Sequence, residues 1–427
     1  MGDSFPTSRY QCGWNRGWAR PRRPLGELVS VIFATGISAL AIYVAVPVSQ
    51  DPSSVERTTR AETATLVAGA TVFARACLEC HGPTGPSSFD LTSESARIRS
   101  SATAALAVRE GLMPPWLPSR SGQSLRGSRE LSPADLQALL AWLDAGAPGP
   151  VSSPEPIAGS AISSAPSNHQ SPNVRLADIT SGWVLSANPG MVIRAFAIGQ
   201  KLHEQLLIAG VEMHCESPGL IHEVSLLTDS AGFATRLDAA DPDPGYDALG
   251  DIGLVASGSA GAVSRLSPRW MLPQGFAISI PRDSVIVAEV HTDARGKIKP
   301  TTTSIDLIPA ELGARVLHPL SLNEIRPVTI EEDTLAIAIH VRADGYTKSL
   351  CVRALSADGL SVTLLDIPSW NDRLSEPWVF LEPFRLCAGS TISVESVRHP
   401  TESQDPAESQ ATSMMGAGGP TVVILTH

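Results

Sequence analysis

Residues 148–175 separate two parts of the chain that have different sequence patterns. The segment is rich in Pro, Ser, Ala and Gly and carries almost no charge, which is typical of an extended, flexible linker. Apolar residues recur at helical spacing before it, whereas short runs rich in Val and Ile, bounded by turn residues, follow it. The 427 residues therefore predict several domains, and the usual domain size of ~150 residues gives about three.

The first 65 residues have the pattern of a membrane anchor. Arginines precede the uncharged apolar run Leu28–Val48, which would span about 31 Å as a helix. A cleavable signal peptide is the alternative, but its apolar run is usually shorter and Val46-Pro47-Val48 is a poor cleavage site. Because basic residues mark the cytoplasmic side, the pattern predicts a single-pass protein of the bacterial inner membrane, in contact with the bilayer and with its bulk in the periplasm. The expected segments are a cytoplasmic N-terminus at 1–24, a transmembrane anchor at 25–48 and a spacer at 49–65.

Residues 66–147 have a helical pattern, which is clearest in the stretch LSPADLQALLAWLDAG. Ser132 is suited to cap the start of this helix, Pro133 suits its first position, and Gly146 suits its end. Leucines at helical spacing give the helix one apolar face: Leu136, Leu139, Leu140 and Leu143. This part of the chain predicts a small all-α domain.

Within that part lies the sequence Cys77-Leu78-Glu79-Cys80-His81, which has the spacing of a haem c attachment site. The two thiols would bind the porphyrin covalently, and the histidine that follows would be an axial ligand of the iron. A zinc half-site needs a second pair of ligands nearby and none follows, and a redox dithiol needs a βαβ surround. The motif therefore predicts one covalently bound haem c.

A second axial ligand is suggested by the stretch Gly111-Leu112-Met113-Pro114-Pro115-Trp116. Prolines cannot continue a helix, so they would fix the methionine in position, and a thioether is a common haem ligand. A methionine is otherwise used as core filler. Ligation by His81 and Met113 leaves no open position for oxygen chemistry, so the module is expected to carry electrons.

The stretches CLECHGPTGPSSFDL, EGLMPPW and ELSPADLQALLAWLDAGAP resemble a small monohaem cytochrome c. Such modules occur in bacterial proteins fused to a region similar to copper type II, ascorbate-dependent monooxygenases. The stretches GVEMHCESPGLIHEVSLLTDSAGFATRLDAADPDPGY, VAEVHTDARGK and LAIAIHVRADG, and the one around Met414-Met415, resemble that second region, which has the fold of peptidylglycine α-hydroxylating monooxygenase. The resemblance implies two all-β, jelly-roll-like sandwiches, at 176–308 and 309–427. The fold class predicted for the whole chain is one transmembrane helix, a small all-α cytochrome c domain and these two sandwiches.

The same resemblance implies the positions of two copper ions. The first site would use His222 and His291, with Glu223 where the family has a second adjacent histidine. The second site would use His340 with Met414 or Met415, and Arg342 stands where its second histidine should be. A guanidinium has no lone pair to give and would repel a cation, so we expect that the second copper site is lost. A carboxylate such as that of Glu223 binds Cu(II) less well than an imidazole does, and we expect that the first site is lost too.

Two further expectations concern cysteines and partners. Cys351 and Cys387 are expected on neighbouring strands, where they would form a disulfide in an oxidising compartment. The formal net charge of −11 disfavours nucleic-acid binding.

The favoured function is that of an electron-transfer or accessory subunit of a respiratory or photosynthetic membrane complex, with the β region used for docking and without catalytic residues. The alternatives are a haem-fed copper monooxygenase and a purely structural subunit.

Overall fold

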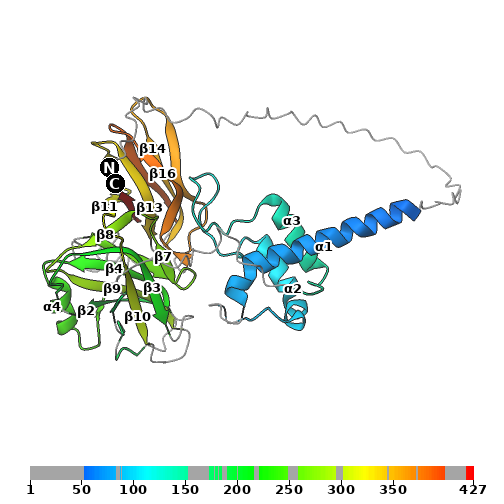
Figure 1. Ribbon diagram of the computed structural model, residues 1–427, viewed down its shortest axis with the longest axis horizontal. Coiled ribbons are helices and arrows are strands. Elements are labelled where there is room, and N and C mark those ends of the chain that lie inside the picture. The colour runs from blue at the N-terminus through cyan, green and yellow to red at the C-terminus, as the bar shows by residue number, and fades with distance from the viewer. Residues whose placement is uncertain are drawn as a thin grey trace. The chain divides into compact units, whose positions relative to one another are not determined.

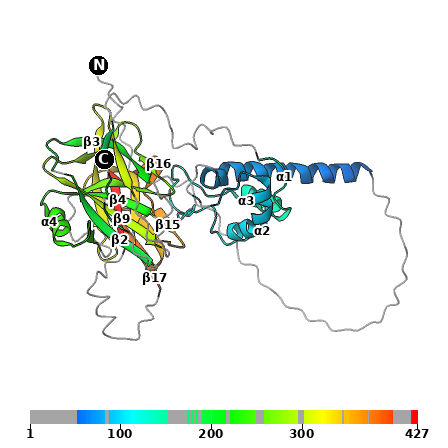
Figure 2. The ribbon, with the colours of Figure 1, turned by 90° about the horizontal axis from the view of Figure 1, so that it is seen from below.

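Two compact units make up the chain, residues 1–64 and residues 65–427. The computed structural model describes residues 52–82, 87, 89–151, 173–176, 178–180, 182–184, 190–199, 201–215, 221–248, 258–294, 302–343, 346–371, 374–399 and 420–427. Only the first part of one helix is described in the first unit. All the sheets belong to the second unit (Figures 1 and 2).

Three helices precede the linker: α1 (Pro52–His81), α2 (Glu94–Arg109) and α3 (Pro133–Asp144). The predicted start of α3 is confirmed, since the Ser132 side chain accepts a hydrogen bond from the backbone of Asp135, and Pro133 occupies the first turn. The helices share an apolar core in which the rings of Phe73 and Trp142 lie 5.0 Å apart. Gly69 allows α1 to approach α3 closely, because a Cβ at this position would lie 2.3 Å from the Cβ of Trp142.

The described strands form sheets of nine, five and four strands. The nine-stranded sheet has the order β1-β10-β3-β8-β11-β18-β13-β16, with β7 also paired to β3. Its strands are β1 (Val174–Leu176), β3 (Leu206–Cys215), β7 (Arg269–Met271), β8 (Phe276–Ile280), β10 (Thr303–Pro309), β11 (Arg315–Asn323), β13 (Thr334–Arg342), β16 (Trp378–Leu386) and β18 (Thr421–Thr426).

The five-stranded sheet has the order β5-β2-β9-β4-β6, and the four-stranded sheet has the order β12-β17-β14-β15. The strands of the five-stranded sheet are β2 (Gly190–Ile198), β4 (Ile221–Asp229), β5 (Tyr246–Asp247), β6 (Gly258–Ser264) and β9 (Val285–Ala294), and a short helix, α4 (Phe233–Ala240), follows β4. The strands of the four-stranded sheet are β12 (Val328–Thr329), β14 (Thr347–Leu355), β15 (Ser361–Ile367) and β17 (Thr391–Arg398).

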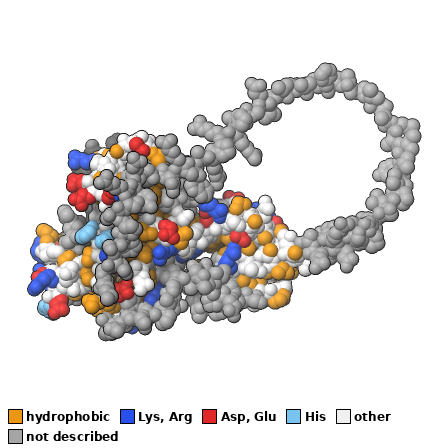
Figure 3. All heavy atoms as spheres, turned by 45° about the horizontal axis from the view of Figure 1, so that its top comes forward, with side chains coloured by type: hydrophobic (Ala, Val, Ile, Leu, Met, Phe, Trp, Pro, Cys, Tyr) orange, Lys and Arg blue, Asp and Glu red, His pale blue; other side chains and the backbone are white. Residues whose placement is uncertain are grey.

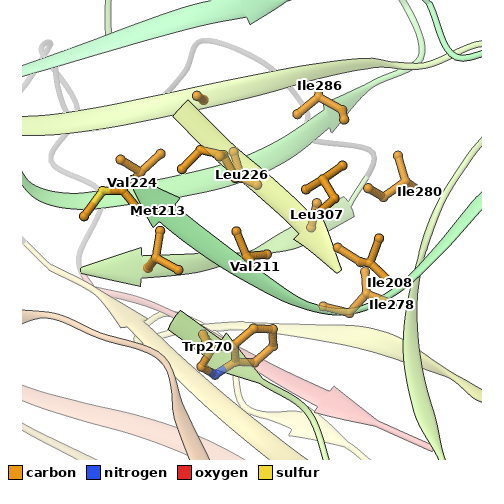
Figure 4. Close-up of a cluster of buried hydrophobic side chains, with 14 of the residues drawn as sticks. Ile208, Val211, Met213, Val224, Leu226, Trp270, Ile278, Ile280, Ile286 and Leu307 are labelled. Carbon is orange, nitrogen blue, oxygen red and sulfur yellow. The ribbon is translucent and has the colours of Figure 1, made fainter. Parts of the chain in front are cut away.

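One large apolar core joins the nine-stranded and five-stranded sheets (Figure 4). Val224 and Leu226 of β4 contribute to it from the five-stranded sheet, while Val211 and Met213 of β3 contribute from the nine-stranded sheet. The alternation of these residues with others along each strand is that expected of strands with one face in a core. At about 25 cal/mol per Å² of apolar area removed from water, burial of this kind is the main force that holds the sheets together.

The segment from Trp116 to Arg129, here called the strap, runs between two strands at the ends of their sheets. Backbone groups of Ser119 and Gln123 bond to Asp366 and Leu364 of β15, at 2.7 and 3.0 Å. Further along the strap, Arg126 donates to Val379 of β16 at 2.8 Å, and Leu381 donates to Ser124 at 2.8 Å. Because β15 and β16 are terminal strands in their sheets, the strap satisfies backbone groups that an edge would leave unpaired.

The predicted fold class is wrong in its arrangement of domains. A separate all-α cytochrome domain is not seen, because the helical residues from Thr65 onward share one unit with the sheets, and the strap between α2 and α3 pairs with strands. Two separate sandwiches are not seen either. Strand β8 pairs in parallel with β11, so that Ala277 lies opposite Val316, and one sheet crosses the boundary expected at 308/309.

In the part of the chain that the structure describes, no helix has both the length and the apolar character needed to cross a membrane. The longest described helix, α1, has 30 residues, but it includes the charged residues Glu56, Arg57 and Arg60. This finding contradicts the predicted single-pass anchor and the inner-membrane localisation that depended on it. The run expected to form the anchor, residues 25–48, lies outside the described residues.

The predicted disulfide between Cys351 and Cys387 is also wrong. Cys351 is a free thiol on β14 of the four-stranded sheet, whereas Cys387 follows β16 of the nine-stranded sheet. The two residues are therefore not on neighbouring strands, which was the basis of the prediction. The Cys351 sulfur instead accepts a hydrogen bond from Arg353 Nε at 3.3 Å.

Candidate functional site

Cys77, Cys80 and His81 lie at the C-terminal end of α1. Residues three and four positions apart lie on the same side of a helix, so both thiols and the imidazole are presented together. Cys77 packs against the apolar core of the helices, and burial, with a smaller effect of Cys80, raises the pKa of its thiol to about 12. The thiol of Cys77 therefore lies among apolar side chains, against which the apolar edge of a porphyrin could pack.

The ring of His81 is oriented by a hydrogen bond to the backbone. Its Nδ1 lies 3.1 Å from the carbonyl oxygen of Phe89, and because a carbonyl can only accept, Nδ1 carries the proton. The other nitrogen, Nε2, is then the one with a lone pair to give to a metal. Metal-binding histidines are oriented in this way by a hydrogen bond from their second ring nitrogen.

Met113 lies in the turn that follows α2. Its backbone N–H donates to the carbonyl of Ala107 at 3.2 Å, and its side chain is 38% exposed. Leu112 and Phe89 are also exposed large apolar side chains, at 63% and 69%. Of these three residues, Phe89 is the one whose contact with His81 is direct, through its carbonyl oxygen, and a porphyrin bound at the motif would cover an exposed apolar group of this kind. Cys77, Cys80 and His81 therefore fit a c-type haem. Bound there, the haem would supply one-electron transfer through its iron.

A second group of polar residues is buried on neighbouring strands of the five-stranded sheet. Glu223 of β4 lies opposite His291 of β9, and Ser225 lies opposite Glu289, so these four side chains share one face of the sheet. Ser225 Oγ donates to Glu223 at 2.7 Å, and His291 Nε2 donates to Glu289 at 2.8 Å. The Glu289 side chain is completely buried, and that of Glu223 is 3% exposed.

Strand β13 of the nine-stranded sheet completes this group. His340 and Arg342, two residues apart on the strand, point in the same direction. His340 Nε2 lies 2.9 Å from Glu223 Oε1, and the Arg342 guanidinium forms an ion pair with Glu289. We call Glu223, Glu289, His291, His340 and Arg342 the buried ionic cluster. It joins by charge contacts two sheets that also share an apolar core.

The charges in this cluster stabilise one another. Burial opposes ionisation of Glu223, but contacts with His340 and His291 outweigh it and hold the pKa of this carboxyl below its usual range. Burial likewise opposes ionisation of Glu289, and the hydrogen bond from His291 with the charge of Arg342 lowers the pKa of Glu289. Burial opposes the charged form of His291 too, but the hydrogen bond to Glu289 and the charge of Glu223 raise its pKa. At neutral pH both carboxylates are therefore ionised and paired.

The cluster does not fit a copper ion. The permanently charged Arg342 lies among the residues that would hold the metal, and it occupies an oxygen of Glu289. In the described part of the chain, no group of three or more His, Cys, Asp or Glu is arranged to hold a metal. A cavity of about 10 Å³ borders His340 and Trp270, which is room for about one water molecule and far below the ~300 Å³ of an ordinary ligand pocket.

The residues that were predicted as copper ligands do not all lie in the buried ionic cluster. Glu223, His291 and His340 meet in the cluster, and His222 is buried beside Glu223 on β4. Met414 and Met415 lie outside the described residues. Glu289 was not predicted as a site residue, although a carboxylate within the otherwise apolar run VIVAEV, two residues before His291, was a signal of a buried partner.

The outer surface differs from this interior group. In the view of Figure 3, acidic and basic side chains of the described residues lie in small separate groups among apolar and neutral ones. Models of known protein families were compared with the chain, and none of them matches it. No curated protein matches the chain either. The residues and their geometry are therefore the basis on which a function is assigned.

Proposed function

We propose that this protein is a c-type cytochrome that carries electrons, with one haem bound covalently through Cys77 and Cys80. His81 and Met113 are the two axial ligands of the iron. With both positions filled by protein, the haem exchanges electrons and does not bind oxygen or a substrate. The β region serves as a rigid scaffold on which a redox partner docks.

The observation that carries this proposal is the orientation of His81. Its Nδ1 proton is committed to the carbonyl of Phe89, so Nε2 is the nitrogen available to a metal, one residue after the second thiol of the motif. A zinc half-site would need two further ligands, and the described residues contain no such group. A c-type haem needs only the thiols, this histidine and one more ligand, which Met113 supplies.

The partner in this proposal is a protein of an electron-transfer chain, such as a subunit of a respiratory or photosynthetic complex. The buried ionic cluster supports a scaffold role for the β region, since its acidic and basic groups are engaged with one another across two sheets. The small cavity beside His340 also favours a scaffold over an enzyme that must enclose an organic substrate.

The test is to produce the full chain in a bacterial host that has the machinery for c-type haem attachment. Covalent haem is then measured by peroxidase staining of a denaturing gel and by intact mass. The reduced-minus-oxidised spectrum shows whether the product is c-type, and parallel metal analysis measures iron and copper. We expect one iron per chain and a c-type spectrum.

The matched variants are Cys77→Ala and Cys351→Ala, which each remove one free thiol. Loss of covalent haem in the first and retention in the second supports the proposal. Equal haem content in both, or the absence of haem from the wild type, overturns it.

A further inference from the structure

Trp116, the first residue of the strap, follows Met113 by three positions. Only Pro114 and Pro115 stand between them, and each proline fixes its own φ and restricts the residue before it. A displacement of Trp116 is therefore passed to Met113 with little loss. The surroundings of Trp116 decide how well the methionine is held.

Trp116 contacts two residues that are anchored in the β region. Its ring meets the ring of Trp378 edge to face, with centroids 6.5 Å apart and planes at 78°. The guanidinium of Arg129 lies over the Trp116 ring, 5.7 Å from its centroid. Aromatic pairs and cation–π contacts of this kind favour one orientation of the indole ring over others.

Arg129 is itself held by a buried ion pair. Its Nη1 lies 2.7 Å from Glu376 Oε1, and the two side chains are only 14% and 5% exposed. Arg129 Nη2 also donates to the carbonyl of Leu266 at 2.8 Å. Trp378 is 2% exposed and begins β16, so one contact of Trp116 lies in the nine-stranded sheet. The other contact, Arg129, is held by Glu376 and Leu266, which lie in the segments next to β16 and between β6 and β7.

We propose that Trp116, together with Arg129 and Glu376, is a positioning group by which the β region holds Met113 on the haem iron. This inference rests on the proposed function, because it concerns an axial ligand of the proposed haem. None of the three touches the haem in this proposal. They act on the equilibrium between a bound and a released Met113. The β region would thereby set the midpoint potential of the haem and the fraction of molecules whose sixth position is open.

The test uses the full chain carrying haem, with three variants: Trp116→Ala, Trp116→Phe and Arg120→Met. Arg120 is the matched control, since it lies on the same strap and pairs at the surface with Glu130. The measurements are the midpoint potential, the charge-transfer band of methionine bound to ferric iron, and the affinity of ferric haem for added imidazole. Imidazole reports the fraction of molecules whose sixth position is open.

We expect Trp116→Ala to weaken the band, lower the potential and raise the imidazole affinity about tenfold or more, with covalent haem unchanged. Trp116→Phe keeps an aromatic edge and should restore most of the wild-type behaviour, while Arg120→Met should match the wild type. Glu376→Gln, which keeps the shape of the side chain, should change the same readouts in the same direction as Trp116→Ala.

Met113→Ala, measured in parallel, separates this inference from the proposed function. If Met113→Ala lowers the potential and Trp116→Ala does not, the positioning group is wrong and the haem assignment stands. If Met113→Ala leaves the potential unchanged, Met113 is not the ligand and the inference fails with it. If the Arg120 control changes as much as Trp116→Ala, the effect is one of general loosening and the inference is overturned.

Discussion

Glu223 on β4 and His340 on β13 lie 2.9 Å apart, carboxylate oxygen to imidazole nitrogen, and both side chains are largely buried. They belong to different sheets, as do the neighbouring pair Glu289 and Arg342. A buried ion pair adds little to stability compared with apolar residues of the same size, but removing one partner leaves a charge in the interior. The cluster is therefore sensitive to single substitutions.

Arg342→Leu should destabilise the protein by about 3–5 kcal/mol, because the fully buried Glu289 carboxylate would lose its permanent counter-charge. The free energy of unfolding in urea measures this. The control is Arg385→Leu, which breaks an ion pair with Asp333 in which both side chains are 48% exposed. That change should cost about 1 kcal/mol or less, since exposed pairs contribute little. Equal losses would contradict the assignment of Arg342 to a buried pair.

Stability should fall on both sides of an optimum in pH. The pKa of Glu223 and of Glu289 is lowered on folding from the ordinary 4.5, so their contribution is complete above that value and is lost as the pH falls through the folded pKa. The pKa of His291 is raised from the ordinary 6.5, so its contribution is present below 6.5 and is lost as the pH rises through the folded value.

Unfolding free energies between pH 3 and 9 would show this profile. In Glu223→Gln one of the two carboxylates no longer titrates, so the decline on the acid side should become shallower. An unchanged slope would show that Glu223 is not paired in the folded state.

Met113→Ala should lower the midpoint potential of the haem and leave the covalent attachment intact. A methionine ligand raises the potential of haem iron, and axial ligands as a class move it within a range of roughly 0.8 V. Potentiometric titration of the holoprotein is the measurement. Met271→Leu, a change on β7 of the nine-stranded sheet, should leave the potential as it is.

Gly69→Ala should destabilise the helical part by about 1–3 kcal/mol, because the added Cβ would overlap Trp142 and the carbonyl of Ala138 on α3. Helix propensity alone predicts the opposite, a gain of up to about 1 kcal/mol for alanine over glycine. The sign of the change in unfolding free energy thus decides between packing and propensity. Ala68→Gly at an exposed position next to it should show the propensity effect by itself.

Local structure could be predicted from the sequence where it depends on nearby residues. Ser132 and Pro133 start α3 as expected, and the apolar run Thr334–Val341 became β13 (Thr334–Arg342). The short runs rich in Val and Ile that follow the linker also form strands, and β9 and β15 are two of them. Capping and strand patterns act within a few residues, which is why they can be read from a single chain.

The pairing of distant segments could not be read in the same way. Nothing local to the strap shows that Leu125 pairs with Phe380, or that β8 and β11 lie in parallel. Arg342 was interpreted only as a residue that excludes copper, because its partner Glu289 lies on another strand of another sheet. Charge partners in an interior depend on how sheets stack, and that is a property of the whole fold.

The strap also limits how this protein could deliver an electron. Many multidomain redox proteins shuttle, with a carrier domain that swings on its linker between donor and acceptor. Here the chain between α2 and α3 is hydrogen-bonded to β15 and β16, so the flexible composition of residues 148–175 gives no such freedom to the residues before it. In the proposed electron carrier, donor and acceptor would therefore both have to come to a haem whose domain does not swing toward them.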